Sequence, residues 1–229
     1  MKKVFLFIII LFINYNCTKN NNDNKNQIPT NIKKDTTSPI KEYTDIKEAL
    51  NNSNNVYRLN LHGQEIEKLP TAISKLSNLR ELDLYEIGLK ELPLEVFKLK
   101  NLRELHLWEN QIKKLPPEIG ELTNLENLDL GENLLSDLPN EIGKLVNLKK
   151  LFLGGNQINK LTPEIGKLIN LQWLSLWKND LKTLPPEIER LTNLKKLILI
   201  GNPFSEQEKA KIRKLLPKCK ILFEEELAD

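Results

Sequence analysis

The chain has few of the residues that carry common catalytic chemistry. Its 229 residues include two histidines and two cysteines, and they contain no glycine-rich phosphate loop, no CxxC pair and no HExxH motif. With Cys17 in a leader segment, Cys219 has no partner for a disulfide bond. We expect Cys219 to be a buried or half-buried cap residue rather than a reactive thiol. The sequence therefore predicts no catalytic residue and no cofactor.

The chain also lacks a long apolar run and a basic domain. Its apolar run Val4–Ile13 is too short to cross a membrane as a helix, which needs about 20 residues. The formal net charge is +3, and the lysines of residues 1–42 account for it, so the rest of the chain is close to neutral. This balance excludes the electrostatic footprint of a nucleic-acid-binding domain.

The dominant feature that is present is a repeat. Seven asparagines stand 23 residues apart, and two leucines separated by one residue follow each of them. A constant period of this length is typical of a solenoid, in which each unit is too small to bury its own apolar face and stacks on its neighbours. The asparagines are Asn55, Asn78, Asn101, Asn124, Asn147, Asn170 and Asn193.

Each repeat combines an extended segment with a return segment. Leucines two apart, such as Leu105 and Leu107, lie on one face of a strand. The turn residue Asn110 is expected to satisfy backbone groups as a buried amide. Apolar residues spaced three and four apart between Ile112 and Leu122 predict a short helical or 3₁₀ return. The strands therefore form a parallel sheet on one side of an α/β solenoid.

The spacing LxxLxLxxN, continued by LPxEIGxLxN, resembles the leucine-rich repeat family in its 23-residue form. The resemblance covers residues 55–204. It implies a curved solenoid with the strands on the concave side, and it implies a protein ligand. Gln64 and Ile87 occupy the place of the turn asparagine in the first two repeats, so we expect looser turns there.

Both ends of the repeat array need caps because a solenoid otherwise exposes an apolar cross-section. In residues 43–54, the segment Tyr43–Asn51 predicts a short helix that begins at Thr44 or Asp45.

The second cap is expected in residues 205–229. Ser205 and Glu208 match a capping box at the start of a helix that ends near Leu216. The segment Cys219–Phe223 can then add an edge strand, followed by an acidic tail.

Residues 1–16 resemble a bacterial lipoprotein signal of the loose type that spirochaete proteins tolerate. Lys2 and Lys3 precede the apolar run, and Cys17 follows it, without the leucine and small residue of a strict signal. We expect Cys17 to carry lipid. The protein would then be an exported outer-membrane lipoprotein that faces either the periplasm or the cell surface. Ordinary secretion and an uncleaved anchor are the alternatives. Residues 17–42, rich in asparagine, predict a disordered tether.

The residues beside the strand leucines form four outward columns, which hold all three tryptophans and both histidines. His62 and His106 fall in different columns, two repeats apart, so they cannot share a zinc ion and we predict no metal site. Repeats two to four are acidic, whereas repeats five to seven combine lysines with apolar residues. The predicted partner-binding residues are Tyr85, Trp108, Phe152, Trp173, Trp177, Ile198, Ile200, Glu81, Asp83, Glu86, Glu104, Glu109, Asp129, Glu132, Lys150 and Lys178.

Two glycines interrupt the column of the tryptophans. Gly131 and Gly154 predict a notch roughly 10 Å wide between Trp108 and Trp177, open to a side chain of a partner. We expect a protein partner, which can be a host protein if the anchor faces outward. The alternatives are a glycan or cell-wall polymer, homodimerisation through the aromatic half, and aromatic side chains that only shield the strands from water.

Overall fold

The computed structural model describes residues 40–66 and 68–224. The predicted signal segment, the lipidation site Cys17, most of the tether and the end of the acidic tail lie outside these residues. Within them, no helix is long and apolar enough to span a membrane.

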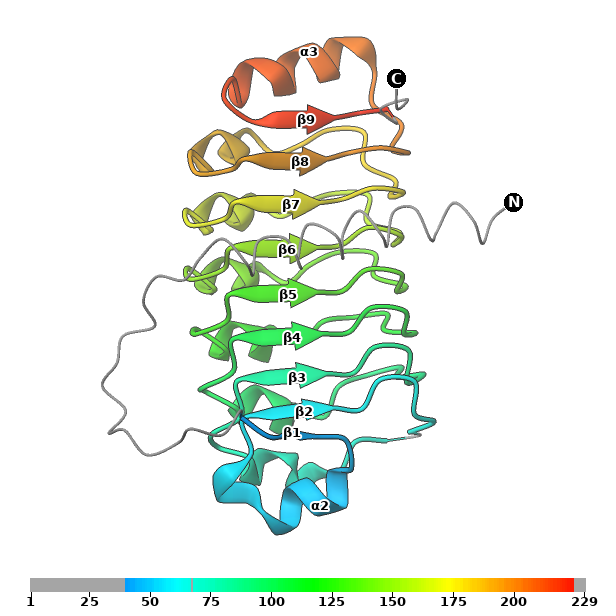
Figure 1. Ribbon diagram of the computed structural model, residues 1–229. Coiled ribbons are helices and arrows are strands. Elements are labelled where there is room, and N and C mark those ends of the chain that lie inside the picture. Colours follow the sequence, from blue (N-terminus) through cyan, green and yellow to red (C-terminus); the bar gives the residue numbers. More distant parts are fainter. Residues whose placement is uncertain (1–39, 67, 225–229) are drawn as a thin grey trace, which may run out of the picture. The chain divides into compact units, whose positions relative to one another are not determined.

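The strands form one parallel sheet of nine strands in sequence order (Figure 1). From β2 to β8, each strand pairs with the next at an offset of one repeat, as in the alignment of Leu82 with Leu105 and then Leu128. The predicted parallel sheet is confirmed. The strands are β1 (Glu42–Tyr43), β2 (Arg58–Asn60), β3 (Glu81–Asp83), β4 (Glu104–His106), β5 (Asn127–Asp129), β6 (Lys150–Phe152), β7 (Trp173–Ser175), β8 (Lys196–Ile198) and β9 (Lys220–Leu222).

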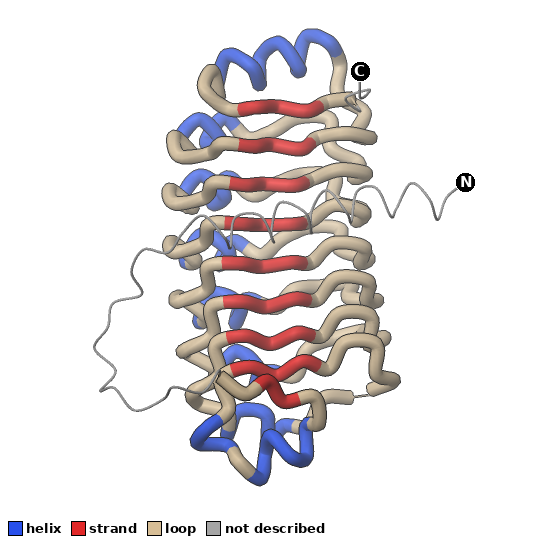
Figure 2. The backbone as a smooth tube through the Cα atoms, in the orientation of Figure 1, coloured by secondary structure: helices blue, strands red, loops and turns tan. Residues whose placement is uncertain are grey.

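The return segments are 3₁₀ helices that lie behind the strands (Figure 2). In the third repeat, Ile119 N–H donates to the Pro116 carbonyl at 3.1 Å, which is the i to i−3 bond of this helix type. Proline before or at the first turn fixes φ where no intrahelical donor is needed. The helices are η1 (Ser53–Asn55), η2 (Thr71–Lys75), η3 (Leu94–Lys98), η4 (Pro117–Glu121), η5 (Asn140–Lys144), η6 (Pro163–Lys167) and η7 (Pro186–Arg190).

The core lies between the sheet and the return helices. Leu105, Leu107, Ile112, Ile119 and Leu122 are each 0% exposed, and the equivalent positions of the neighbouring repeats are buried in the same way. The leucine pair and the apolar stripe therefore face each other inside the solenoid, as predicted. Continuous stacking buries the apolar face that one repeat leaves open.

The buried asparagines form an internal ladder. Asn133 Nδ2 donates to the carbonyls of Leu107, Leu130 and Gly131, and its Oδ1 accepts from Ile112 N–H at 3.0 Å. Asn110, Asn156 and Asn179 make equivalent bonds. The buried amide is confirmed, because each side chain makes hydrogen bonds to backbone groups of two adjacent repeats.

The first two repeats depart from this ladder. The Gln64 amide donates instead to the Thr44 carbonyl of the N-terminal cap at 2.7 Å, and Ile87 is buried in the core. A second, exposed ladder uses the asparagines that define the repeat. In one of its steps, Asn124 Nδ2 donates to the Lys100 carbonyl at 2.8 Å. The 23-residue period is therefore supported by amide bonds at both ends of the strands.

The N-terminal cap differs in part from its prediction. The helix α2 (Ile46–Asn51) begins after Asp45, whose side chain accepts from Glu48 N–H, so the capping residue is confirmed as Asp45. Glu42 and Tyr43 lie outside the helix, where they form β1 and pair with β2. Two residues carry no periodicity, and the sequence therefore gives no signal for this edge strand.

The C-terminal cap follows the prediction more closely. The helix α3 (Glu206–Leu215) begins with Ser205 Oγ accepting from Glu208 N–H at 3.2 Å, and β9 adds the last strand of the sheet. Glu208 does not complete the capping box, because its carboxylate accepts from Leu184 N–H of the sixth repeat at 3.4 Å. Cys219 is half-buried, as predicted, and burial raises the pKa of its thiol to about 11.

Candidate binding face

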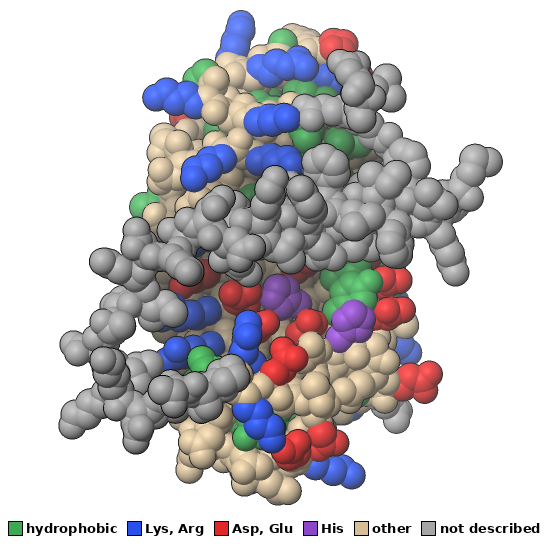
Figure 3. Space-filling model, viewed as in Figure 1, with side chains coloured by type: hydrophobic (Ala, Val, Ile, Leu, Met, Phe, Trp, Pro, Cys, Tyr) green, Lys and Arg blue, Asp and Glu red, His purple; other side chains and the backbone are tan. Residues whose placement is uncertain are grey.

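We use the term strand face for the side chains that β2–β8 and their following turns direct away from the core. Acidic side chains gather over β3–β5, whereas basic side chains gather over β8 and β9 (Figure 3). In register, Glu81 lies beside Glu104, and His106 lies between Asp83 and Asp129. The predicted acidic half of the face is therefore one continuous surface.

One column of the strand face has a left-handed backbone. Its glycines, Gly63, Gly155 and Gly201, have φ between 67° and 75°, as that residue permits. The four other repeats place charged residues in the same conformation, which costs an L-residue about 1–2 kcal/mol. They are Glu86 at φ 51°, Glu109 at 56°, Glu132 at 47° and Lys178 at 45°.

The repeat pattern predicts that these four residues lie on the face, but it does not predict their left-handed conformation. The signal for this conformation in the sequence is the presence of glycine in three of the seven repeats. Glycine would relieve the strain at the other four positions, yet those positions hold charged side chains. Strained residues cluster at functional sites, so the four charged residues of this column are candidates for a functional role.

A polar and aromatic cluster adjoins the acidic column. Tyr85 Oη donates to Glu109 Oε2 at 3.0 Å, and the His62 ring packs on the Tyr85 ring with centroids 4.2 Å apart. Burial and the Glu109 carboxylate raise the pKa of Tyr85 above its usual range, so the phenol stays a donor. An open hollow of about 600 Å³, lined in part by Glu86, Glu109 and Gln111, lies beside it.

The predicted notch between the tryptophans is absent. The Trp108 ring lies over Gly131 and the Trp177 ring lies over Gly154, where an added Cβ would overlap each ring. The two rings meet and stack, with centroids 6.2 Å apart, and the residues are only 5% and 3% exposed. The prediction of an open notch is therefore wrong, because bare backbone gives a large neighbouring ring a surface to cover.

The other aromatic residues also pack on one another. Phe152 meets Trp173 edge to face at 5.4 Å, and Lys196 Nζ lies 4.7 Å from the Trp173 ring centroid. Phe152 is 6% exposed, so the expected exposure is wrong for it as well. Trp173, Ile198 and Ile200 are partly exposed and stay candidates for partner contact.

His106 has carboxylates as neighbours rather than the second histidine. Its Nε2 lies 3.5 Å from Glu104 Oε2. Burial lowers the pKa of His106, but the hydrogen bond to Glu104 and the charges of Asp129, Asp83 and Glu104 raise it above its usual value on balance. Burial also raises the pKa of Asp129 to about 6. The column spacing separates the two histidines, but it also places carboxylates of neighbouring strands beside His106.

A polar groove of about 520 Å³ lies at the opposite ends of the strands. It is lined by the exposed asparagine ladder and by Arg103, Glu126 and Lys149. Glu126 accepts from Arg103 at 3.2 Å and from Lys149 at 2.6 Å, so the charges of this groove are paired internally. The groove is outside the strand face, and the sequence analysis did not identify it.

Comparisons with known proteins identify the repeat. Family models described as leucine-rich repeat region, leucine-rich repeats (2 copies) and leucine-rich repeat match residues 48–136, 123–165 and 146–204. A solved leucine-rich repeat protein of Leptospira interrogans is similar to this chain, with 48% sequence identity and a TM-score of 0.72. The match covers 74% of this chain but 43% of that one, so the chain spans less than half the length of this relative. A comparison with curated proteins gives no match.

Proposed function

Because this chain belongs to the leucine-rich repeat family, of the type found in spirochaete bacteria, and such domains are generally protein-interaction modules, we propose that its strand face binds a protein partner without catalysis. The observation that carries the proposal is the left-handed column with Glu86, Glu109, Glu132 and Lys178. These side chains are kept at positions where glycine would cost the backbone less.

The charge of the face indicates the chemistry of the partner. Three of the four strained residues are glutamates, and they continue the acidic surface over β3–β5. A basic surface on the partner would complement them, and complementary charges raise the association rate more than they raise the affinity. Binding should therefore weaken as the salt concentration rises, because exposed charges are screened.

The packing of the aromatic residues helps to distinguish protein binding from glycan binding and self-association. A glycan platform needs open ring faces, whereas Trp108 and Trp177 stack on each other and are buried. Trp173 alone among the tryptophans keeps partial exposure. The closed ring faces and the acidic half of the face therefore support protein binding over glycan binding. Self-association through Trp173 and its neighbours is a separate alternative, which light scattering would detect.

The test compares two double variants, one on the strand face and one on the return helices, each of which removes two negative charges. A partner is first captured from envelope or host extracts, and its affinity is then measured for the double variant Glu109→Gln and Glu132→Gln. We expect at least tenfold weaker binding, or about 1.4 kcal/mol. The matched control is the double variant Glu118→Gln and Glu189→Gln, which removes the same charge from η4 and η7. Equal affinities of the two double variants would refute the strand face as the binding site.

We also propose that the protein is exported and anchored through lipid on Cys17. The support is the sequence of the leader: basic residues, a short apolar run and a cysteine directly behind it. Cys17→Ser should then release the protein from the detergent phase of a membrane extract. Unchanged partitioning of this variant would leave secretion without lipid, or an uncleaved apolar anchor, as the explanation.

A further inference from the structure

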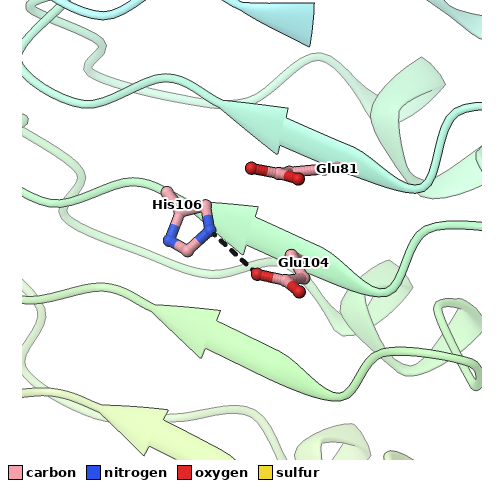
Figure 4. Close-up of side chains that lie close together, drawn as sticks. All are labelled: Glu81, Glu104 and His106. Carbon is pink, nitrogen blue, oxygen red and sulfur yellow. Dashed lines mark ion pairs between the residues drawn. The ribbon is translucent and has the colours of Figure 1, made fainter. Parts of the chain in front are cut away.

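Three potential metal ligands converge on the acidic half of the strand face. Glu81 projects from β3, and Glu104 and His106 project from β4 on the same side of the sheet (Figure 4). One ligand atom from each of the three lies within 4.8 Å of the others. The strand register holds the three backbone positions, so their proximity does not depend on a mobile loop.

The surroundings of these side chains favour a cation. Glu81 and Glu104 are directly opposite each other on adjacent strands, an arrangement that is destabilising for like charges. Asp83 and Asp129 flank His106 in the next column and add two carboxylates. Arg58 Nε binds Glu81 Oε2 at 2.5 Å and neutralises part of this charge. The charge of Lys150 also stabilises the Glu104 carboxylate, so the two glutamates are compensated only in part by side chains of this chain.

We propose that Glu81, Glu104 and His106 bind a divalent transition-metal ion, with Zn²⁺ as the best match. An imidazole nitrogen with two carboxylate oxygens is a ligand set that suits Zn²⁺, whereas Mg²⁺ and Ca²⁺ prefer oxygen ligands alone. The site is independent of the proposed protein partner, since all three ligands belong to this chain.

The geometry requires only side-chain movement. Ligand atoms about 2.1 Å from a tetrahedral zinc ion lie roughly 3.4 Å apart, and the His106 to Glu104 distance is already 3.5 Å. Rotation of the long Glu81 side chain can bring the third ligand to this distance. Three protein ligands leave a fourth position, which water or a side chain of another protein can fill.

The test measures Zn²⁺ binding to the full-length chain without a histidine tag. Titration calorimetry should detect a site in the wild type that becomes at least tenfold weaker in His106→Ala and in Glu104→Gln. His62→Ala is the matched control, because His62 also lies on the strand face but outside the cluster, and its affinity should equal that of the wild type. Sites formed by Cys17 or Cys219 would persist in all four proteins.

A second measurement needs no variant. The chain has two histidines, so its imidazole NMR signals are few, and equimolar Zn²⁺ should shift those of His106 and leave those of His62 unchanged. Circular dichroism checks that each variant is folded. Equal Zn²⁺ affinity of His106→Ala and the wild type would overturn the proposal. His106 signals that do not shift with Zn²⁺ would also overturn the proposal. Displacement of Zn²⁺ by an equal concentration of Mg²⁺ would do the same, since both results indicate diffuse attraction to the carboxylates.

Discussion

The stacked tryptophans make a specific energetic prediction about Gly154. The Trp177 ring lies where a Cβ on residue 154 would be, and it is 3% exposed in that position. Gly154→Ala must therefore displace the ring from its contacts with the backbone and with Trp108. Overpacking of this kind typically costs about 1–3 kcal/mol. Gly154 does not have a positive φ, so the alanine itself introduces no backbone strain.

A double-mutant cycle separates this overlap from other effects. In a Trp177→Ala background the space beside residue 154 is empty, and Gly154→Ala should then be neutral or stabilise the fold by about 0.4–1 kcal/mol, because it restricts the unfolded chain. The coupling energy between the two positions should be about 1–4 kcal/mol.

Urea denaturation followed by circular dichroism measures the four free energies of unfolding. Tryptophan fluorescence gives an independent check, since displacement of Trp177 in the single variant should shift emission toward longer wavelengths. If Gly154→Ala has the same effect in both backgrounds, the ring does not lie on the glycine and the open notch returns as the better description.

Four further predictions concern other parts of the molecule. Leu130→Ala should cost about 2–5 kcal/mol through a core cavity, whereas Asp129→Asn on the strand face removes a charge that burial disfavours and should not destabilise the fold; equal losses in thermal unfolding would contradict the assigned orientation of β5. Asn156→Leu removes four hydrogen bonds to buried backbone and should cost about 1–3 kcal/mol, seen as faster amide exchange in repeats four to six. Glu109→Gly relieves the backbone strain of a left-handed residue, so the melting temperature of this variant should equal or exceed that of the wild type. A clear decrease would show that the Glu109 side chain stabilises the fold. Cys219, with its pKa raised to about 11 by burial, should react with iodoacetamide at pH 8 roughly a hundredfold more slowly than in the unfolded chain, with a tenfold rise per pH unit up to about pH 11.

The sequence by itself determined the repeat, the two sides of the solenoid and the helix of each cap. Each of these depends on residues close together in one unit. Leucines two apart must share a face of a strand, and a strict 23-residue period must place equivalent side chains beside one another in the stack. The orientation of Leu105 and Leu107, the 3₁₀ returns and the buried amide of Asn110 could therefore be predicted without coordinates.

Tertiary structure alone decided what happens between repeats on the strand face. Trp108 and Trp177 are three repeats apart in the sequence, and their rings meet because the two glycines between them leave space. The column in which a residue lies does not predict this contact. The left-handed column depends on the turn that follows each strand, and the meeting of Glu81 with Glu104 and His106 depends on side-chain rotamers. Periodicity assigns each residue to a column, but the direction of a long side chain within the column depends on which neighbours leave room for it.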